Sequence, residues 1–340
     1  MPFQITLLPS QRQFQSSAGE TLLEAGLRQN INLPYGCRNG ACGACKVQVL
    51  TGEVEHGKAM EHALSHAERQ EGKTLLCCAS TKSNLSIACK VVGGVDLIPA
   101  KTMPSRLQKM QRVAPDVMIL YLKLPASERL QFHAGQYLDV LLKDGQRRSF
   151  SMANAPKDDE FVQLHVRHIP GGLFTDHVFS SMKERDILRI NGPHGSFFLR
   201  EDSQKPVVLL AGGTGFAPIK SIIEQSIATG STRPMHLYWG ARTQQDLYLN
   251  ALALYWKNTY PHIHYTPVLS AVTESDKWHG RTGLVHYAVQ EDLPDLSGYQ
   301  VYACGAPIMI DTARKAFTTH CALADIDFFA DAFSYAADVV

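Results

Sequence analysis

The stretch Tyr35-Gly-Cys-Arg-Asn-Gly-Ala-Cys-Gly-Ala-Cys-Lys-Val47 places Cys37, Cys42 and Cys45 in a C-x₄-C-x₂-C array. This is the spacing of three thiolate ligands of a [2Fe–2S] cluster, whose fourth ligand comes from further along the chain. Three thiolates of one short loop can reach a cluster only if the backbone wraps tightly around it. The loop glycines Gly36, Gly40 and Gly43 permit this wrapping, because glycine adopts positive φ angles and lets N–H groups face the sulfurs.

The segment Thr74-Leu-Leu-Cys-Cys-Ala79 supplies the predicted fourth thiolate. Adjacent side chains of an extended segment point to opposite sides, so only one of the two cysteines can face the cluster. Cys77 follows an apolar pair, and we therefore predict Cys77 as the ligand. Cys78 is then expected beside the cluster or in the packing around it, and Cys89 in the core of a predicted strand, residues 86–91.

Three other uses of these cysteines fit the sequence less well. A structural zinc site usually pairs two short C-x₂-C knuckles, and the sequence contains no second knuckle. A disulfide framework is typical of small secreted domains. Cysteines of an ordinary core would not need a loop with three glycines.

The composition is that of an ordinary globular protein, with 45% hydrophobic and 19% charged residues. Its 340 residues are enough for two or three domains. A net charge of +1 gives no reason to expect a nucleic acid or an anionic membrane as partner. We expect a cytoplasmic protein without a membrane span, because no signal segment or long apolar run is present and eight cysteines suit a reducing compartment.

The order of predicted elements divides the chain into four parts. Residues 1–92 run strand, strand, helix, cysteine loop, strand, loop, cysteine, strand, which resembles the β-grasp ferredoxin fold. Residues 93–104 contain glycines and prolines without a period and are predicted to be a linker. Short strands and turns in residues 105–203 predict an antiparallel β-barrel. Strands alternate with helices in residues 204–340, which predicts a doubly wound parallel α/β domain.

Two stretches of the predicted barrel suit a dinucleotide with a flat ring. Arg147-Arg-Ser-Phe-Ser-Met-Ala-Asn154 can place a cation on a pyrophosphate, an aromatic ring over a heterocycle and a hydroxyl at its edge. Gly171-Gly172, followed by Thr175 at the start of a helix, can form an anion-binding nest. The second pattern also occurs in plain turns and helix caps, so it carries little weight alone.

The last part begins with Pro206-Val-Val-Leu-Leu-Ala-Gly-Gly-Thr-Gly-Phe-Ala-Pro-Ile-Lys220. A buried strand here enters a glycine turn and then a helix, whose N-terminal N–H groups can bind phosphate. The turn differs from the G-x-G-x-x-G fingerprint, since Pro218 stands where the third glycine would be.

Together, these segments resemble the ferredoxin–NAD(P) reductase superfamily, in the variant with an N-terminal plant-type ferredoxin domain. Arg148-Ser-Phe-Ser-Met-Ala-Asn154 matches the family's FAD motif R-x-Y-S-x-A-N, with Phe150 in place of tyrosine. Gly212–Pro218 matches the family's nucleotide turn, and Cys304-Gly-Ala-Pro307 matches its Cys-Gly-x-Pro motif. The resemblance covers essentially the whole chain, and it extends to reductase components of bacterial oxygenases and to reductases that serve CDP-6-deoxy-glucoseen formation in 3-deoxysugar synthesis.

The resemblance implies roles for individual residues. Arg148 would bind pyrophosphate, Ser151 would lie near flavin N5, and an aromatic residue near the C-terminus would cover the flavin. The implied cofactor-binding residues are Arg148, Phe150, Ser151, His165, Val166, Arg167, Gly172, Thr175, Gly213, Thr214, Gly215, Cys304 and Gly305. The implied catalytic residues are Ser151, Thr214, Cys304 and Phe333, and the cluster ligands are Cys37, Cys42, Cys45 and Cys77.

The implied activity is electron transfer from NAD(P)H through FAD and the [2Fe–2S] cluster to a partner protein, a deoxysugar dehydrase or an oxygenase component. The first 92 residues carry nine Lys and Arg against seven Glu, a formal charge of +2, which suits a module tethered to its own electron donor. The sequence favours NADH but leaves NADPH open, since Arg242 can meet a 2′-phosphate whereas Asp246 can disfavour one.

Two further functions remain possible from the sequence. One is an iron–sulfur redox sensor whose flavin half serves only as a scaffold. The other is a reductase of free flavin or quinone that needs no protein partner. The intact flavin and nucleotide motifs argue against the sensor.

Overall fold

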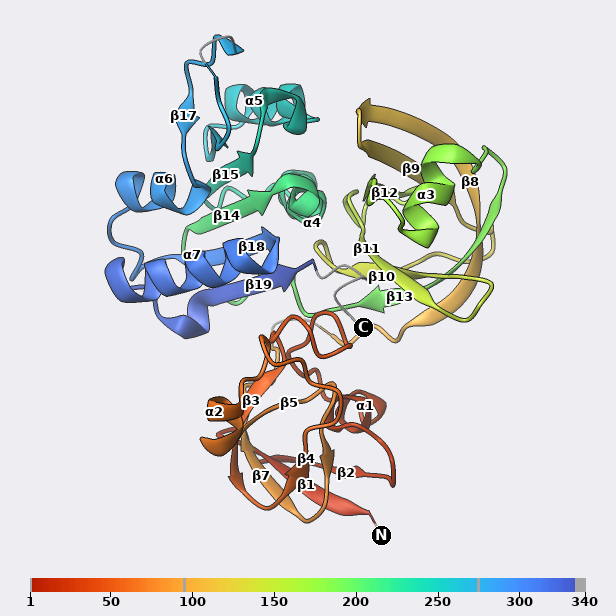
Figure 1. Cartoon of the computed structure of the whole chain (residues 1–340), viewed down its shortest axis with the longest axis vertical. Helices are drawn as coiled ribbons and strands as arrows, with labels where there is room; N and C mark the ends of the chain where they lie inside the picture. The colour runs from red at the N-terminus through yellow and green to blue at the C-terminus, as the bar shows by residue number, and fades with distance from the viewer. Residues whose placement is uncertain (1, 94–95, 274–275, 334–340) are drawn as a thin grey trace. The chain divides into compact units, whose positions relative to one another are not determined.

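A computed structural model describes residues 2–93, 96–273 and 276–333 (Figure 1). Contacts divide the chain into two compact units. The first comprises the residues up to Pro99 together with residues 194–202, and the second comprises residues 100–193 and 203–333. Among the described residues, no helix is long and apolar enough to cross a membrane.

The first unit contains a five-stranded sheet in the order β2-β1-β7-β3-β5. Strand β1 pairs with β2 antiparallel and with β7 parallel, which confirms the predicted β-grasp arrangement. Its elements are β1 (Phe3–Leu8), β2 (Arg12–Ser16), α1 (Leu22–Arg28), β3 (Lys46–Thr51), β4 (Val54–Glu55), α2 (His66–Gln70), β5 (Lys73–Leu75), β6 (Ser80–Thr81) and β7 (Leu85–Ala88).

Helix α1 begins where the sequence provides a capping box. The Thr21 side chain accepts a hydrogen bond from the backbone N–H of Glu24, and the Glu24 carboxylate accepts one from the N–H of Thr21. Leu22 and Leu23 are buried beneath this cap. The helix is thereby fixed against the sheet just before the cysteine loop.

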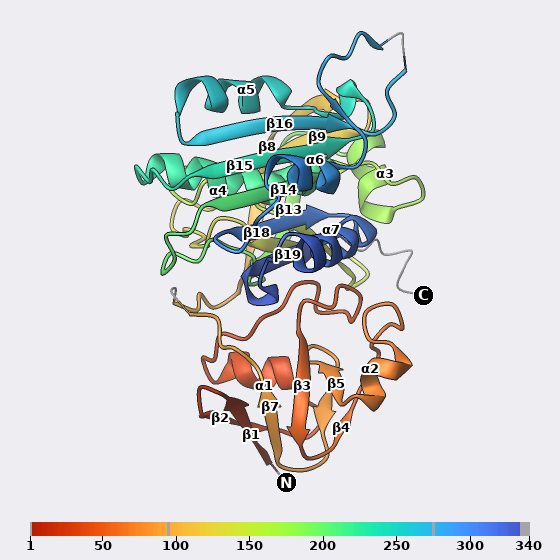
Figure 2. The same cartoon turned by 90° about the vertical axis from the view of Figure 1, so that its left-hand side faces the viewer.

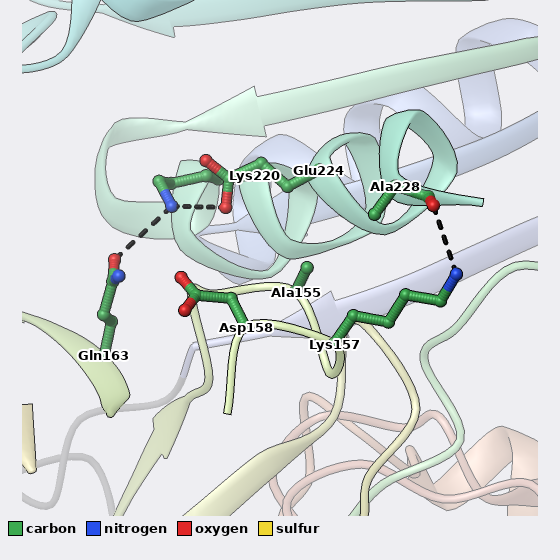
Figure 3. A pocket seen from close by; sticks show the side chains of 7 residues that line it. All are labelled: Ala155, Lys157, Asp158, Gln163, Lys220, Glu224 and Ala228. Carbon is green, nitrogen blue, oxygen red and sulfur yellow. Dashed lines mark hydrogen bonds and ion pairs between the residues drawn. The ribbon is translucent and has the colours of Figure 1, made fainter. Parts of the chain in front are cut away.

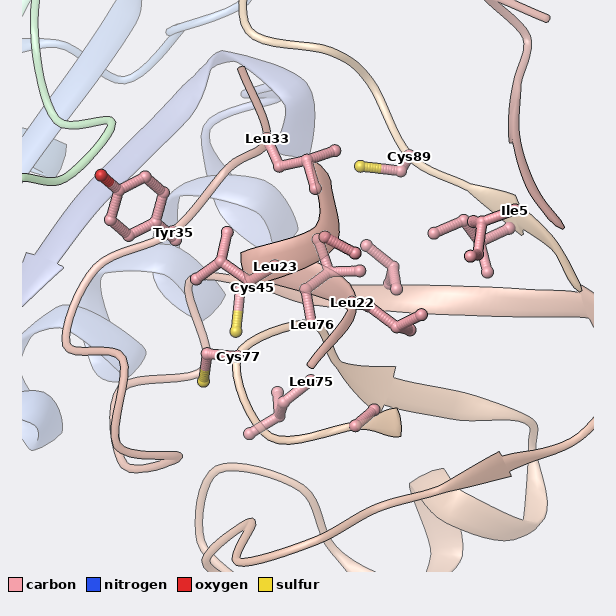
Figure 4. Packing of buried hydrophobic residues seen from close by; sticks show 14 of the residues in the cluster. Ile5, Leu22, Leu23, Leu33, Tyr35, Cys45, Leu75, Leu76, Cys77 and Cys89 are labelled. Atoms are coloured by element: carbon pink, nitrogen blue, oxygen red, sulfur yellow. The ribbon is translucent and has the colours of Figure 1, made fainter. Parts of the chain in front are cut away.

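Cys89 lies outside the strand in which we expected it. Strand β7 ends at Ala88, where its neighbour β1 ends at Leu8, and the bond from the N–H of Cys89 to the carbonyl of Leu8 is the last of that ladder. Cys89 is nevertheless buried, with 4% of its surface exposed, so its expected place in the core is confirmed. Figure 4 shows it beside Ile5 and Leu33, away from the thiols of Cys45 and Cys77.

The first half of the second unit is a six-stranded antiparallel sheet in the order β11-β10-β13-β8-β9-β12. A bridge between Met152, just after β11, and Leu164 of β12 joins the two edges and closes a barrel. Strand β8 begins at Lys101, so residues 101–104 of the expected linker already pair with β13. The elements are β8 (Lys101–Ala114), β9 (Val117–Lys123), β10 (Tyr137–Leu141), β11 (Arg147–Ser151), β12 (Val162–Arg167), α3 (Leu173–Ser180) and β13 (Ile187–His194).

The second half is a six-stranded parallel sheet in the order β17-β16-β15-β14-β18-β19. Helices α4 and α5 cover one face and α6 and α7 the other, as the two views show (Figure 1 and Figure 2). The elements are β14 (Val207–Gly212), η1 (Gly213–Gly215), α4 (Phe216–Ala228), β15 (Met235–Ala241), η2 (Gln244–Asp246), α5 (Asn250–Thr259), β16 (Ile263–Leu269), β17 (Arg281–Thr282), α6 (Val285–Asp292), β18 (Gln300–Gly305), α7 (Pro307–His320), η4 (Asp325–Asp327) and β19 (Phe328–Ala332).

The strand order reverses between β14 and β18. The chain leaves β14 in one direction toward β17 and returns on the other side of it at β18. In an open α/β sheet, ligands bind in the crevice at the carboxyl ends of the strands at such a point. The residues there are Gly212 and Gly305, which end the two strands.

Candidate functional site

The cysteine loop is wound so that two of its sulfurs face two of its amides. The N–H of Cys37 lies 3.4 Å from the Cys42 sulfur, and the N–H of Cys42 lies 3.4 Å from the Cys37 sulfur. Gly40 and Gly43 adopt the expected positive φ angles of 83° and 71°. The third residue with a positive φ is Arg38 rather than Gly36, at 61°.

The loop amides favour a negatively charged sulfur. A hydrogen bond with the Cys42 thiol and further bonds from the backbone N–H groups of Asn39, Ala41 and Cys42 lower the pKa of Cys37 to about 6. The hydrogen bond with the Cys37 thiol, and then burial, raise the pKa of Cys42. The ligands of an iron–sulfur cluster are thiolates, and N–H donors stabilise their negative charge. This loop provides such N–H donors around Cys37.

The fourth predicted ligand meets the loop at Cys45. The Cys77 thiol forms a hydrogen bond with the Cys45 thiol, and this bond raises the pKa of Cys77. Figure 4 shows both side chains at the edge of the buried core. Among the described residues no three metal-binding side chains converge on a single-ion site. The four thiols instead form two pairs, which is the donor set of a dinuclear cluster with two thiolates on each iron. The residues present therefore fit a [2Fe–2S] cluster.

Cys78 lies close to the predicted ligand set. Its sulfur is 3.6 Å from that of Cys77, and a Cβ on Gly40 would lie 2.8 Å from it. Cys77 is buried within the core, whereas Cys78 is only half-buried.

We expect Cys78→Ser to keep the full complement of iron and acid-labile sulfide, because Cys77 is the predicted fourth ligand. Cys77→Ser should lose at least about half of both, since a cluster with an alcohol in place of one thiolate is held less tightly. Iron and sulfide analysis of the two purified variants, with visible absorption, checks this. Loss of the cluster in Cys78→Ser alone would move the ligand to Cys78.

In β11, the strand with the FAD motif, neighbouring side chains differ in their burial. Ser151 is buried, and Arg148 and Phe150 are half-buried. The Arg148 guanidinium bonds to the carbonyl of Arg147 and to the side chain of Gln146. The Phe150 ring packs 5.2 Å from that of Phe174 in α3, so the strand and the helix start that were expected to share one ligand touch each other.

The glycine pair before α3 forms a tight turn. A Cβ on Gly172 would lie 2.6 Å from Thr175 Oγ1 and 2.9 Å from the carbonyl oxygen of Ile169, so this position needs glycine. The Thr175 hydroxyl donates to the Ile169 carbonyl and accepts from the Ile169 N–H. The Thr175 hydroxyl therefore stabilises the turn, so a phosphate would be bound by the backbone of the turn rather than by this side chain.

Strands β11 and β12 carry buried polar atoms whose hydrogen bonds a bound ligand would complete. Among the described residues, the buried atoms without a hydrogen-bond partner include Ser151 Oγ, His165 Nε2 and two guanidinium nitrogens of Arg167. Arg167 does form an ion pair with Asp116, at 3.4 Å. Val166 points into the barrel core. Buried polar groups normally have partners, so these orphans fit a polar heterocycle such as that of FAD.

The nucleotide turn packs directly against β18. A Cβ on Gly215 would lie 2.1 Å from the carbonyl oxygen of Cys304, and one on Gly305 would lie 3.1 Å from Gly212. Thr214 is half-buried in the middle of η1. Cys304 is fully buried, and burial raises its pKa. The turn and the Cys-Gly-x-Pro motif thus form one glycine-lined surface at the switch point.

Two further contacts connect this surface with its surroundings. A Cβ on Gly213 would lie 3.3 Å from the guanidinium of Arg167, so the end of β12 reaches the nucleotide turn. Phe333 follows β19, and its N–H donates to the carbonyl of Gly305 at 2.8 Å. The predicted flavin residue and the predicted terminal aromatic therefore both border the turn.

An aromatic cluster behind the turn was not foreseen from the sequence. The rings of Phe216 and Trp239 stack at 3.8 Å, and the Trp239 indole donates to the carbonyl of Gly213. Tyr248 contacts both rings edge-on and lies within hydrogen-bond distance of His165 Nδ1, at 2.9 Å. The only sequence signal is the aromatic Tyr-Trp pair that ends in Trp239.

Burial, and secondarily the Lys220 ammonium, lower the pKa of His165 well below its ordinary value. Below about pH 6.5 the imidazole is protonated in the unfolded chain but stays neutral in the folded chain. The free energy of unfolding should therefore fall by up to about 1.4 kcal/mol for each pH unit below that value. His165→Gln should therefore show a smaller fall of Tm than the wild type between pH 7 and pH 5.5. The exposed His279→Gln is the control, and equal falls in all three proteins would refute the assignment.

Three sequence families match successive parts of the chain. The 2Fe-2S iron-sulfur cluster binding domain matches residues 5–82, the oxidoreductase FAD-binding domain residues 104–199, and the oxidoreductase NAD-binding domain residues 209–315. These matches agree with the cysteine loop, the barrel motif and the glycine turn described above.

Several relatives match nearly the whole length of the chain. The chain is 42% identical to the CDP-6-deoxy-L-threo-D-glycero-4-hexulose-3-dehydrase reductase of Yersinia pseudotuberculosis, covering 98% of this chain and 99% of the relative. It is 34% identical to a terephthalate 1,2-dioxygenase reductase component of Comamonas, covering 98% of both. The crystal structure of the Amycolatopsis cytochrome P450 reductase GcoB matches with a TM-score of 0.79 and 33% identity, over 98% of this chain and 99% of that one. The chain therefore belongs to the ferredoxin–NAD(P) reductase superfamily, as an iron–sulfur flavoprotein oxidoreductase with [2Fe–2S], FAD and NAD(H) as its cofactors.

Proposed function

We propose that the electron acceptor of this reductase is a CDP-6-deoxy-hexulose 3-dehydrase. The observation that carries this proposal is the 42% identity, over nearly the full length of both chains, to a reductase named for such a dehydrase. The relatives named for oxygenase systems are 34–36% identical over comparable lengths. Both groups match at least nine tenths of this chain, so the higher identity is what separates them.

The residues of the chain have separate tasks in this proposal. When bound, FAD supplies the conversion of a two-electron hydride into single electrons, and the cluster supplies one-electron carriage. Cys37, Cys42, Cys45 and Cys77 hold the cluster, and the loop N–H groups stabilise its charge.

The second unit would bind both nucleotides. Arg148 and the backbone around Gly172 and Thr175 would bind the pyrophosphate of FAD, and Phe150 would stack on the flavin. The buried polar atoms of Ser151, His165 and Arg167 that lack a hydrogen-bond partner would bond to the flavin's polar edge. The turn Gly213-Thr214-Gly215, with Cys304 and Gly305, would receive the nicotinamide nucleotide, and Phe333 would cover the flavin.

NADH is the proposed electron donor. The Asp246 carboxylate already accepts hydrogen bonds from the N–H and the hydroxyl of Thr243, at 2.9 and 3.0 Å. It therefore stays as a fixed negative charge four residues from Arg242, which disfavours a 2′-phosphate by repulsion. Comparison of kcat/KM for NADH and NADPH tests this, and a preference for NADPH would reject it.

The acceptor is tested by coupled turnover. The purified reductase is mixed with NADH and with a CDP-6-deoxy-hexulose 3-dehydrase and its sugar nucleotide, or with the oxygenase component of a terephthalate dioxygenase. We expect kcat/KM for the dehydrase to be at least about tenfold higher, or about 1.4 kcal/mol in transition-state free energy. A preference for the oxygenase component would favour the second candidate, an oxygenase reductase.

We also propose a cytoplasmic location. All eight cysteines lie within the described residues, and all eight are free thiols. Free thiols persist in a reducing compartment. Cell fractionation with an antibody against the chain would test this, and recovery in an oxidising compartment would reject it.

A further inference from the structure

Helix α4 buries a charged side chain in the contact between the barrel and the parallel sheet. Only 6% of Lys220 is exposed. Its ammonium donates to the backbone carbonyl of Ala153 at 3.0 Å and to the Glu224 carboxylate at 2.6 Å, and lies 3.4 Å from the side-chain oxygen of Gln163 (Figure 3). Ala153 and Gln163 belong to the barrel, so Lys220 joins the two halves of the second unit.

The next residue makes a parallel connection. Ser221 is fully buried, and its hydroxyl donates to the backbone carbonyl of Asn154 at 2.6 Å. The Asn154 side chain in turn donates to the carbonyl of Asp158 and accepts from the N–H of Gln163. Two consecutive residues of α4 thus hold two consecutive carbonyls of a loop that is itself braced.

The two ends of this connection are the two motifs of the site. Ala153 and Asn154 are the last residues of the FAD motif and follow Ser151 by two and three positions. Lys220 and Ser221 stand in the first two turns of the helix that begins directly after the nucleotide turn Gly213–Gly215. A shift of α4 relative to the barrel would therefore move the nucleotide turn relative to the flavin strand.

Helix stability does not account for Lys220. A lysine four residues before a glutamate is the less favourable order of such a pair in an isolated helix. The neighbouring residues Ile219, Ile222 and Ile223 are fully buried, and an apolar residue would continue that face without the cost of burying an ammonium. The contact that a lysine provides here and an apolar residue would not is the hydrogen bond to the Ala153 carbonyl.

The space beside these residues would permit movement if the bonds were absent. A cavity of about 380 Å³ lies between α4 and the barrel loop, lined by residues that include Lys157, Asp158, Lys220 and Glu224 (Figure 3). Packing alone therefore does not fix the loop on this side.

We propose that Lys220 and Ser221 are positioning residues that fix the FAD motif relative to the nucleotide turn and thereby set the rate at which NADH reduces FAD. The inference rests on the assignment of the two nucleotide sites under Proposed function. In the reduction one hydrogen leaves the dihydronicotinamide C4 with its electron pair and forms an N–H bond at flavin N5. NADH is oxidised, FAD is reduced, and one proton from water balances the charge.

The test is anaerobic stopped-flow reduction of the bound FAD by NADH, at several NADH concentrations. Lys220→Met is combined with Glu224→Gln, so that no unpaired carboxylate stays buried, and Ser221→Ala is measured separately. We expect the limiting rate to fall about 10- to 100-fold in the double variant, since displacement of reacting groups by about 1 Å costs about 100-fold. The apparent dissociation constant for NADH should change less than about threefold, and the FAD content should be unchanged, because no nucleotide contact is removed.

Lys157→Met is the matched control. Lys157 also joins the two halves through an ammonium and a backbone carbonyl, that of Ala228 at 3.1 Å, but at the far end of α4 and on the exposed surface. Its limiting rate should stay within about twofold of the wild type.

The outcomes separate the inference from its premise. Failure of NADH to reduce the wild-type flavin would reject the assigned sites. With an active wild type, an unchanged limiting rate in the double variant, or equal losses in the double variant and in Lys157→Met, would overturn the positioning role. If the double variant does not fold, Ser221→Ala decides alone: a fall of at least about threefold supports the role, and a smaller one overturns it.

Discussion

Replacement of Cys42 by serine is expected to abolish electron delivery to a protein acceptor while NADH still reduces ferricyanide at about the wild-type rate. Cys42 and Cys37 lie side by side, each with its N–H on the other's sulfur, so the loss of Cys42 would remove one of the two thiolates predicted for one iron. The FAD and NAD(H) residues lie in a separate compact unit with its own core, and the serine leaves them unchanged. Ferricyanide reduction should stay within about threefold, whereas reduction of the acceptor protein should fall by at least about 100-fold.

The control for this variant is Cys89→Ser. Cys89 is another buried cysteine of the same unit, but it lies on the other side of the core, and its thiol donates to the carbonyl of Lys90. It should keep the cluster and both activities. Loss of ferricyanide reduction in a folded, FAD-containing Cys42→Ser protein would show that the two halves do not divide the labour in this way.

The second large effect is expected for Gly215→Ala. A Cβ at this position would lie 2.1 Å from the Cys304 carbonyl oxygen, 2.5 Å from its carbonyl carbon and 2.9 Å from the Gly305 nitrogen, all of them backbone atoms. Backbone atoms cannot rotate away as a side chain can, so the turn and β18 must move apart. We expect a loss of about 1–3 kcal/mol of stability and a fall of about 100-fold in kcat/KM for NADH.

Gly298→Ala is the matched control for this substitution. Gly298 precedes the same strand, and a Cβ on it would meet nothing within 4 Å. Its Tm and its kcat/KM for NADH should equal those of the wild type. A Gly215→Ala protein that reduces its flavin at the wild-type rate would show that the close approach of the two motifs is not needed for nucleotide binding.

The cysteine loop could be predicted from the sequence because its information is local. Three predicted ligands within nine residues have few alternatives, and the prediction of Cys77 rather than Cys78 follows from the apolar pair before it, which the structure buries. The arrangement of three domains could be predicted for a similar reason. Each motif stands at an element boundary that its own residues define, as the strand, glycine turn and helix at Gly212–Pro218 do.

The contacts between elements could not be predicted in this way. The tie from Lys220 to Ala153 and the bond from Tyr248 to His165 join residues 67 and 83 positions apart, and no periodicity records such pairs. The one signal in the sequence for the role of Lys220 is that a lysine stands among the isoleucines of a buried helix. The end of β7 at Ala88 was also missed, because it depends on where the neighbouring strand β1 ends, at Leu8, rather than on Cys89 itself.

The account depends on a chain of three redox groups in one polypeptide. The measurement that tests it most directly is an anaerobic titration of the purified protein with NADH, followed by absorbance and by electron paramagnetic resonance, after analysis of FAD, iron and acid-labile sulfide. We predict about one FAD, two iron and two sulfide per chain, with both the flavin and the cluster reduced by NADH. Iron without sulfide, or a bound flavin that NADH fails to bleach, would contradict the account.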